Sequence, residues 1–300
     1  MSSIVDEPFH EGERAVQERI GVRERLAQVG PLLMRARLTE EQRAFFPLLD
    51  FVVVGVVDDD GRPRATLVDG GARSPTPTTL AVGLPSSADP ARARITSGAP
   101  IAILGLQPHT RRRNRVNGVV GSIDERGFVV DVKQAFGNCP KFIRVRTTTI
   151  EANHKKAKAT TSTTLSAADR ACLRACDTFF IASAHATAGD DVAAHGVDVS
   201  HRGGKAGFFD VDVDGVLWVP DYQGNFYFNT LGNLVVQPRA GLVLFDDRGG
   251  LLQLAVDVEV IWDGSIVDAV AGAQRLLKMR VTEVVRIEHA LAVRFTDAGA

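Results

Sequence analysis

The sequence predicts a predominantly β protein with peripheral helices (α+β), built as two barrel-like halves. Short runs of β-branched and other apolar residues, separated by turn signals, fill residues 51–146 and begin again near residue 177. Few long helical segments separate these runs, which favours an antiparallel sheet or barrel in each region. The segments follow the same order in both regions at an offset of roughly 130–140 residues, which indicates an internal duplication.

The first region opens with a predicted helix over residues 10–29, which Gly30-Pro31 should end. A short helix is expected near Asp89 to Gly98, because Asp89 suits the N-cap and a proline occupies the first helical position. The predicted strands are FVVVGVV, RPRATLVD, TTLAVGL, PIAILGL, RVNGVVGSI and GFVVDVKQAF.

The second region follows a Thr/Ser/Lys-rich segment, residues 147–165, which we interpret as a surface linker. A helix capped by Ser166 comes next, and later helices are predicted over 229–237 and 266–278, before a final strand over 284–295. The predicted strands before that are TFFIASA, GFFDVDVDGVLWVP, AGLVLFDD and LLQLAVDVEVIWD. The expected domains are therefore 1–146, the linker 147–165, and 166–300.

Composition excludes several classes of protein. The chain has 300 residues with 35 basic and 36 acidic side chains, a net charge of −1, so bulk binding to nucleic acid or a membrane surface is not expected. No stretch approaches 18 uncharged apolar residues. Three cysteines and no secretion signal predict a reduced, cytoplasmic protein. A small-molecule substrate or electron donor is the expected partner, and a homodimer the favoured assembly.

A basic cluster lies in TRRRNRVNG, which contains Arg113, Arg115 and Asn117. Residues 111–146 hold nine Lys/Arg against three Asp/Glu. Arginine binds phosphate through bidentate, charge-assisted hydrogen bonds, so these residues are candidate phosphate ligands. A solvated basic face remains an equal alternative, and the lack of interleaved aromatic residues disfavours nucleic acid.

Two further segments combine glycine with polar side chains. DVSHRGGKAGF contains the candidate ligands Ser200, His201, Arg202 and Lys205, and glycines let backbone approach a ligand closely. PDYQGNFYFNTLGN precedes a predicted helix capped by Asn229 or Thr230, whose free N–H groups would favour an anion. A polar hairpin loop and an ordinary helix cap are the alternative interpretations.

Other site chemistry is not indicated. The sequence has no G-x-G-x-x-G after a strand, no P-loop, no H-E-x-x-H and no C-x-x-C. Cys139 fits a buried cysteine better than a nucleophile. The seven histidines show no recognisable ligand spacing, and Cys172 and Cys176 have no histidine nearby, so no metal site is expected.

Six segments together resemble one family. They are FHEGE, TRRRNRVNG, QAFGNCPKFI, DVSHRGGKAGF, PDYQGNFYFNTLGN and QPRAGLVLFD. The chain resembles the FMN-binding split-barrel proteins related to pyridoxamine 5′-phosphate oxidase, in the long form with two split-barrel halves. The resemblance covers about residues 9–146 and 177–263. It implies an FMN held by its phosphate, with the isoalloxazine ring between two barrels.

The resemblance also implies the site residues. Ser200, His201, Arg202 and Lys205 match the strand and turn that reach the phosphate. A second matching group reaches the phosphate and ribityl chain, or lies near the flavin ring: Asn225, Asn229, Thr230 and Gln253. The internal repeat adds a third group, supplied by the first half across the interface: Arg113, Arg115 and Asn117.

Some positions depart from the family pattern. Asn229 and Thr230 stand where a typical oxidase has Arg-Lys, and Arg64 replaces an expected aromatic residue. We therefore expect the first half to serve as a structural lid rather than a second flavin site, and we do not expect pyridoxamine oxidase activity. No catalytic residue is assigned.

The function predicted from these features is that of an FMN-dependent oxidoreductase, passing electrons from a reduced donor to oxygen or a small organic acceptor. Two alternatives remain. One is a non-catalytic protein that binds flavin, haem or deazaflavin, with His201 as the candidate haem ligand. The other is a scaffold with a decayed site.

Overall fold

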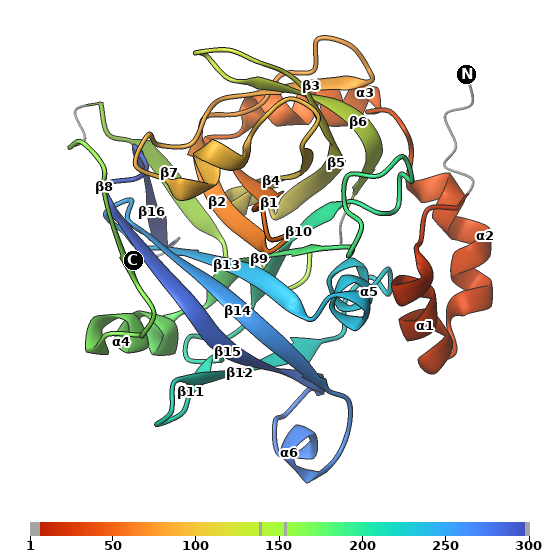
Figure 1. Cartoon of the computed structure of the whole chain (residues 1–300), viewed down its shortest axis with the longest axis vertical. Helices are drawn as coiled ribbons and strands as arrows, with labels where there is room; N and C mark the ends of the chain where they lie inside the picture. Colours follow the sequence, from red (N-terminus) through yellow and green to blue (C-terminus); the bar gives the residue numbers. More distant parts are fainter. Residues whose placement is uncertain (1–6, 138–139, 153–154, 298–300) are drawn as a thin grey trace.

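The computed structural model describes residues 7–137, 140–152 and 155–297. Strands dominate the molecule and short helices lie at its periphery (Figure 1). The predicted fold class is therefore confirmed. Among the described residues, the helices fall short of the length and apolarity that a membrane crossing needs.

The first half is a six-stranded antiparallel sheet in the order β2-β1-β4-β5-β6-β3. Its strands are β1 Phe51–Val57, β2 Pro63–Asp69, β3 Thr79–Val82, β4 Pro100–Gln107, β5 Arg112–Ile123 and β6 Phe128–Gly137. The apolar runs found in the sequence form these strands, because their β-branched residues fit a pleated, buried surface.

The second half is a larger sheet in the order β10-β9-β13-β14-β15-β12-β11, with β8 added beside β15. Its strands are β8 Lys158–Ser162, β9 Thr178–Ala184, β10 Val197–Gly203, β11 Asp210–Val211, β12 Val216–Tyr222, β13 Arg239–Phe245, β14 Leu251–Ile261 and β15 Ala273–Glu288. A separate pair is formed by β7 Arg146–Ile150 and β16 Val293–Asp297.

The two halves have the same topology. If β1 to β6 are matched in chain order with β9, β10, β12, β13, β14 and β15, the strand order of the first sheet becomes that of the second. The second sheet adds only β11 at one edge and β8 beside β15. The helix between the third and fourth strands is also matched, η2 Pro90–Arg94 in the first half and α5 Asn229–Val236 in the second. The structure therefore confirms the predicted duplication.

The halves pack against each other through equivalent strands. In β1, Val52 and Val54 belong to the core of the first half, whereas Phe51 and Val53 face the second half. This follows from the alternation of side chains along a strand. The shared apolar cluster between the halves also contains Ala65, Leu67, Leu104, Phe180, Ala182, Val197, Val199 and Val243.

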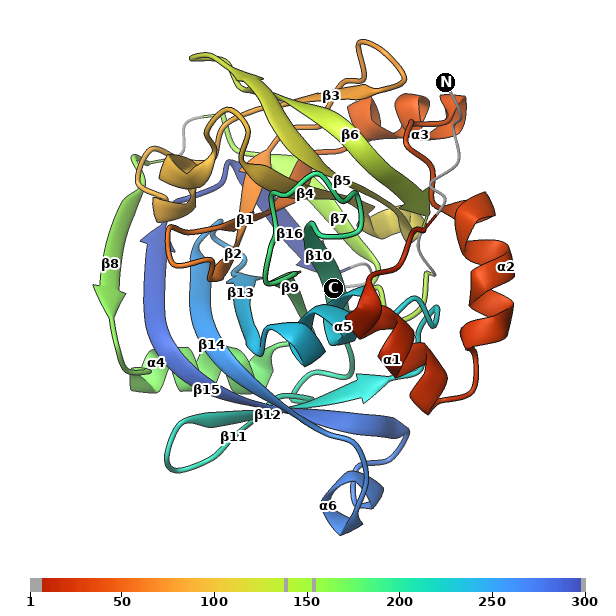
Figure 2. The ribbon, with the colours of Figure 1, turned by 45° about the vertical axis from the view of Figure 1, so that its right-hand side comes forward.

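Helices border the sheets (Figure 2). They are α1 Glu11–Arg19, α2 Arg23–Leu33, α3 Glu40–Phe45, α4 Ala167–Ala175, α6 Ser265–Asp268, η1 Phe46–Leu48 and η3 Pro108–Thr110. The helix expected over 10–29 is two helices, because the chain turns at Gly21 with φ +71°. The expected end at Gly30-Pro31 was wrong: α2 continues to Leu33, since proline in a last turn removes only one hydrogen bond.

Two other predictions need correction. Residues 147–165, predicted as a surface linker, contain β8 and all of β7 except its first residue, because their threonines suit edge strands. The helix expected over 266–278 is reduced to α6, and residues from 273 onward form β15. That strand pairs with both β12 and β14, so tertiary pairing overrides the local helix propensity.

Candidate functional site

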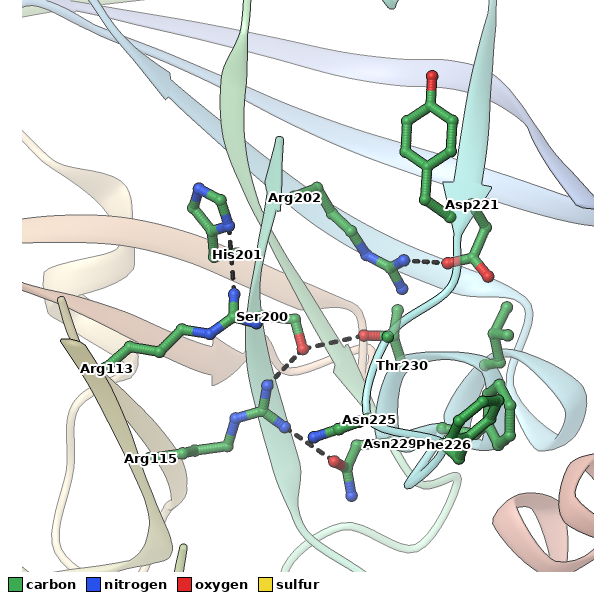
Figure 3. Close-up of a pocket in the computed structure, with 14 residues that line it drawn as sticks. Arg113, Arg115, Ser200, His201, Arg202, Asp221, Asn225, Phe226, Asn229 and Thr230 are labelled. Carbon is green, nitrogen blue, oxygen red and sulfur yellow. Dashed lines mark hydrogen bonds and ion pairs between the residues drawn. The ribbon is translucent and has the colours of Figure 1, made fainter. Parts of the chain in front are cut away.

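A polar pocket lies where the two halves meet (Figure 3). The first half contributes β5, and the second contributes β10, the end of β12 and the start of α5. The cavity is about 100 Å³ in volume. Its lining residues are Arg113, Arg115, Ser200, His201, Arg202, Asp221, Tyr222, Gly224, Asn225, Phe226, Phe228, Asn229, Thr230 and Leu231.

Arg115 crosses from the first half into the second. It is 3% exposed, and its guanidinium donates to Asp198 Oδ1 at 2.8 Å, to Asn229 Oδ1 at 3.0 Å and to Ser200 Oγ. Asn117 Nδ2 donates to the same Asp198 oxygen at 2.9 Å. A buried cation is tolerated only when it is paired and hydrogen-bonded, and this network meets that condition.

Glu13 of α1 supports the same network from behind. Its carboxyl group accepts from the backbone N–H of His10 at 2.9 Å and from the Asn229 side chain. Burial, followed by the charge of Asp198, raises the pKa of Glu13 well above its ordinary range. The N-terminal helix is thereby connected to Asn229, which also contacts Arg115.

Arg202 brings a second guanidinium to the pocket. It pairs with Asp221, which also lies 3.5 Å from Arg275 Nε. Within the part of the chain that the structure describes, the buried Nε atoms of Arg202 and Arg115 make no hydrogen bond. Unsatisfied buried donors are costly, so these two groups are suited to receive an anionic ligand.

The first turn of α5 also faces the pocket. Its N-cap is Phe228, with no side-chain hydrogen bond to the helix, rather than Asn229 or Thr230 as expected. Phe226 and Phe228 have φ values of +66° and +64°, a conformation rare for aromatic residues. An uncapped helix N-terminus presents free N–H groups and a partial positive charge to an anion.

His201 is neutral in this environment. Burial, followed by the charges of Arg113 and Arg202, holds the pKa of His201 well below its ordinary value. Arg113 Nη1 lies 3.2 Å from His201 Nδ1 and donates to it, so the ring carries its proton on Nε2.

Eight of the eleven predicted site residues line this pocket: Arg113, Arg115, Ser200, His201, Arg202, Asn225, Asn229 and Thr230. Arg113 and Arg115 of β5 reach across the interface to this pocket. Three residues lie elsewhere. Lys205 is exposed beyond β10, Asn117 holds Asp198 behind the pocket, and Gln253 lies at the opposite end of the interface.

The duplication shows which residues at that opposite end correspond to the pocket residues, because the strand registers of the two halves can be matched. In the first half, Val54 pairs with Thr66 and Ile103, and Leu104 pairs with Arg115. In the second half the corresponding pairs join Ile181 with Ser200 and Leu242, and Val243 with Gln253. Thr66 is therefore equivalent to Ser200, and Gln253 to Arg115.

At this opposite end, the carboxylate of Asp89 lies against Thr66 and Gln253, the counterparts of Ser200 and Arg115. It accepts from Thr66, from Gln253 Nε2 at 2.9 Å and from the backbone N–H of Ala91 at 2.8 Å. Asp89 is the N-cap of η2, as the sequence predicted, and is equivalent in topology to Phe228. At this end of the interface the helix N-cap supplies a carboxylate. At the other end the N-cap supplies none, and Arg115 pairs with Asp198 of β10 instead.

The sequence indicated some of these residues only in part. Asp221, Phe226 and Phe228 lie in the segment PDYQGNFYFNTLGN, but nothing in that segment shows which side chains line a cavity. Glu13 lies in FHEGE, some 216 residues from its partner Asn229. Its role depends on the docking of α1 against α5, which no local pattern reports.

Among the described residues, the cysteines add no reactive group to this pocket. Cys139 and His154 lie outside the described residues. Cys172 and Cys176 form no disulfide within the described chain, and burial raises the pKa of Cys176 to about 12. A thiol with that pKa is protonated and a poor nucleophile at neutral pH.

Comparison of the sequence with protein families and with curated proteins finds no match. Among solved structures, the chain is similar to a putative pyridoxamine 5′-phosphate oxidase from Lactobacillus delbrueckii, with 20% identity, 34% of this chain and 94% of that chain covered, and a TM-score of 0.28. It is also similar to a FAD-binding protein from Mesorhizobium loti, with 11% identity, 44% of this chain and 97% of that chain covered, and a TM-score of 0.28. A third similar structure is the haem storage protein HutZ from Vibrio cholerae, with 14% identity, 37% of this chain and 86% of that chain covered, and a TM-score of 0.26.

Proposed function

We propose that this chain is a flavoprotein that binds FMN through its phosphate in the pocket between the halves, and that it acts as an oxidoreductase. The observation that carries the proposal is the asymmetry of the duplicated interface. At one end, Asp89 supplies an anion to Thr66 and Gln253. At the other end, the equivalent Ser200 and Arg115 have no anion from the N-cap, which supports an external anion there.

The pocket offers groups suited to a phosphate. Arg115 and Arg202 bring charge, Ser200 and Thr230 bring hydroxyl groups 3.1 Å apart, and the first turn of α5 brings backbone N–H groups. These are the donors that phosphate oxygens accept from most strongly. Asp198 and Asp221 hold the two guanidinium groups in place.

The dimensions also fit one end of a nucleotide. A cavity of about 100 Å³ is well below the roughly 300–1,000 Å³ of pockets that enclose a whole small-molecule ligand, so it suits one end of FMN, such as the phosphate. Tyr222, Phe226 and Phe228 also line it. Aromatic faces suit a flat ring, so these residues favour a ligand that joins a phosphate to an aromatic system. FMN, when bound, would supply the redox chemistry.

Haem binding is the second candidate, and His201 bears on it. An axial ligand must offer a nitrogen lone pair, but Arg113 already donates to His201 Nδ1, and the buried Nε2 carries the proton. The geometry therefore favours flavin over haem. The absorption spectrum of the purified protein distinguishes the two, and reduction by NADH followed by reoxidation in air distinguishes an enzyme from a carrier.

The site assignment is tested with a matched pair of variants. Arg202→Ala removes a pocket guanidinium, whereas Lys205→Ala removes an exposed charge three residues further along. We expect Arg202→Ala to weaken FMN binding at least about tenfold, or ~1.4 kcal/mol, and Lys205→Ala to leave it unchanged. Fluorescence titration measures both. Equal FMN affinities of the two variants would show that the FMN phosphate does not bind in this pocket.

A further inference from the structure

A second cluster of ligand-forming side chains lies away from the pocket, where the N-terminal helix meets the loop between β9 and β10. Glu11 opens α1, and His185 and His195 flank the loop. His185 Nε2 is 2.9 Å from one Glu11 carboxylate oxygen, and His195 Nε2 is 3.8 Å from the other. His10 lies beside them, and ligand atoms of His10, Glu11 and His185 all fall within 4.8 Å of one another.

The remaining nitrogen of each loop histidine also has partners. His195 Nδ1 is 2.8 Å from Asp190 Oδ2, and Thr187 donates to the same carboxylate oxygen at 2.8 Å. His185 Nδ1 is 3.0 Å from Thr187 Oγ1 and lies 3.2 Å from the Thr187 backbone N–H, which donates to it. In metal sites, the second nitrogen of a ligating histidine commonly donates to a carboxylate, as His195 can to Asp190, which fixes the ring and directs the other nitrogen to the ion.

The two loop rings are already arranged side by side. Their centroids are 3.9 Å apart with an interplanar angle of 10°, and both Nε2 atoms face the Glu11 carboxylate. The side chain of Glu11 is 56% exposed and that of His195 22%, whereas those of His185 and His10 are buried. A cation from solvent can therefore reach the cluster, and its floor is formed by fixed groups.

We propose that Glu11, His185 and His195 bind one divalent transition-metal ion, with Zn²⁺ as the best fit. Two imidazole nitrogens and a carboxylate match the ligands that Zn²⁺ prefers, whereas Mg²⁺ and Ca²⁺ prefer oxygen ligands only. His10 closes the buried side, its Nδ1 accepting from the Gly12 N–H at 3.1 Å.

The position of the cluster predicts what the ion does. Glu11 and His185 are 174 residues apart and belong to the N-terminal helix and the second half. An ion that bridges them stabilises the folded state, because it binds ligands that are brought together only by folding. This consequence does not depend on whether the pocket between the halves binds FMN.

The test uses the full chain without an affinity tag, freed of metal by chelation and then titrated with Zn²⁺ in a calorimeter. We expect one Zn²⁺ per chain and a higher melting temperature with Zn²⁺ than with Mg²⁺. Glu11→Gln changes an exposed side chain and should keep the fold, and we expect it to weaken Zn²⁺ binding at least about tenfold.

Three further variants complete the experiment. His185→Ala should abolish the binding, and Asp190→Asn should weaken it, because Asp190 orients His195. His109→Ala, at an exposed histidine in η3, should leave it unchanged. Absence of Zn²⁺ binding by the wild-type chain would overturn the proposal, as would equal binding by Glu11→Gln and wild type.

Discussion

Arg115 shows how individual residues determine the character of the pocket. It is a buried cation whose three partners come from two elements of the other half: Asp198 and Ser200 on β10, and Asn229 at the start of α5. Breaking a buried ion pair by removing one partner leaves an uncompensated charge, which is strongly unfavourable. The pocket therefore depends on the close association of both halves.

Asp89 gives a prediction at the same scale. Burial raises the pKa of Asp89, although Thr66, Ala91 and Gln253 all donate to its carboxylate. Its folded-state pKa is above the unfolded value, so its stabilising contribution is complete below about pH 4 and is lost as pH rises through the folded pKa. Asp89→Asn keeps a good N-cap and does not titrate.

The measurement is urea unfolding of wild type and Asp89→Asn between about pH 3.5 and pH 7. We expect the unfolding free energy of wild type to fall relative to that of the variant as pH rises. A difference that is constant with pH would show that Asp89 titrates alike in both states.

Site residues could be predicted from the sequence where their chemistry is visible locally. Arg113 and Arg115 stand out because arginines are concentrated there, and the repeat indicated that their strand faces the other half. Glu13 could not be predicted, because a glutamate near the N-terminus gives no sign of burial. Gln253 was predicted near the flavin but lies at the end occupied by Asp89, and only the strand registers reveal this.

Helix α5 is the element that links these residues. Its N-terminus borders the pocket, and its body packs closely against α1 (Figure 2). A Cβ on Gly232 would lie 2.4 Å from Glu13 Cγ and 2.6 Å from the Glu13 backbone nitrogen. The two helices can approach this closely only because that position is a glycine.

We therefore expect Gly232→Ala to destabilise the protein by about 1–3 kcal/mol, because α1 must move away from α5. Gly224→Ala is the matched control, since a Cβ there would meet nothing within 4 Å. Chemical denaturation compares both variants with wild type. Equal stability of the two variants would mean that α1 is not held at this contact.

Local signals predicted some elements and not others. The cap at Asp89 and the capping box of α4, with Ser166 and Asp169, follow from residue type and spacing, and both are present. The start of α5 at Asn229 was predicted correctly, but its N-cap was placed one or two residues late, because the N-cap Phe228 is held in a left-handed conformation by its surroundings. Residues 273–278 became a strand because two neighbouring strands pair with them.

At the scale of the whole molecule, the duplication makes two equivalent positions at one interface. The sequence predicted the repeat from the order of its segments, and the strand orders confirm it. The difference between the two positions could not be predicted, because it depends on which side chains the registers bring together across the interface. Thr66, Asp89 and Gln253 are separated by up to 187 residues in the chain.

One ligand per chain is the stoichiometry that this asymmetry predicts. The carboxylate of Asp89 accepts from both Thr66 and Gln253. At the other end Arg115 pairs with Asp198, but the helix N-cap supplies no anion there and the pocket leaves room for an external one. Calorimetric titration with FMN should give one site per chain. A stoichiometry of two FMN per chain would show that Asp89 does not block binding at the end of the interface with Thr66 and Gln253.

The most direct measurement compares the affinities of FMN and riboflavin for the wild-type chain by fluorescence titration. The two ligands share the flavin ring and ribityl chain and differ only in the phosphate. If the phosphate is held by Arg115, Arg202, Ser200 and the first turn of α5, FMN binds at least about tenfold more tightly than riboflavin. Equal affinity for both ligands, or no binding of FMN, would contradict the assignment of this pocket as a phosphate site.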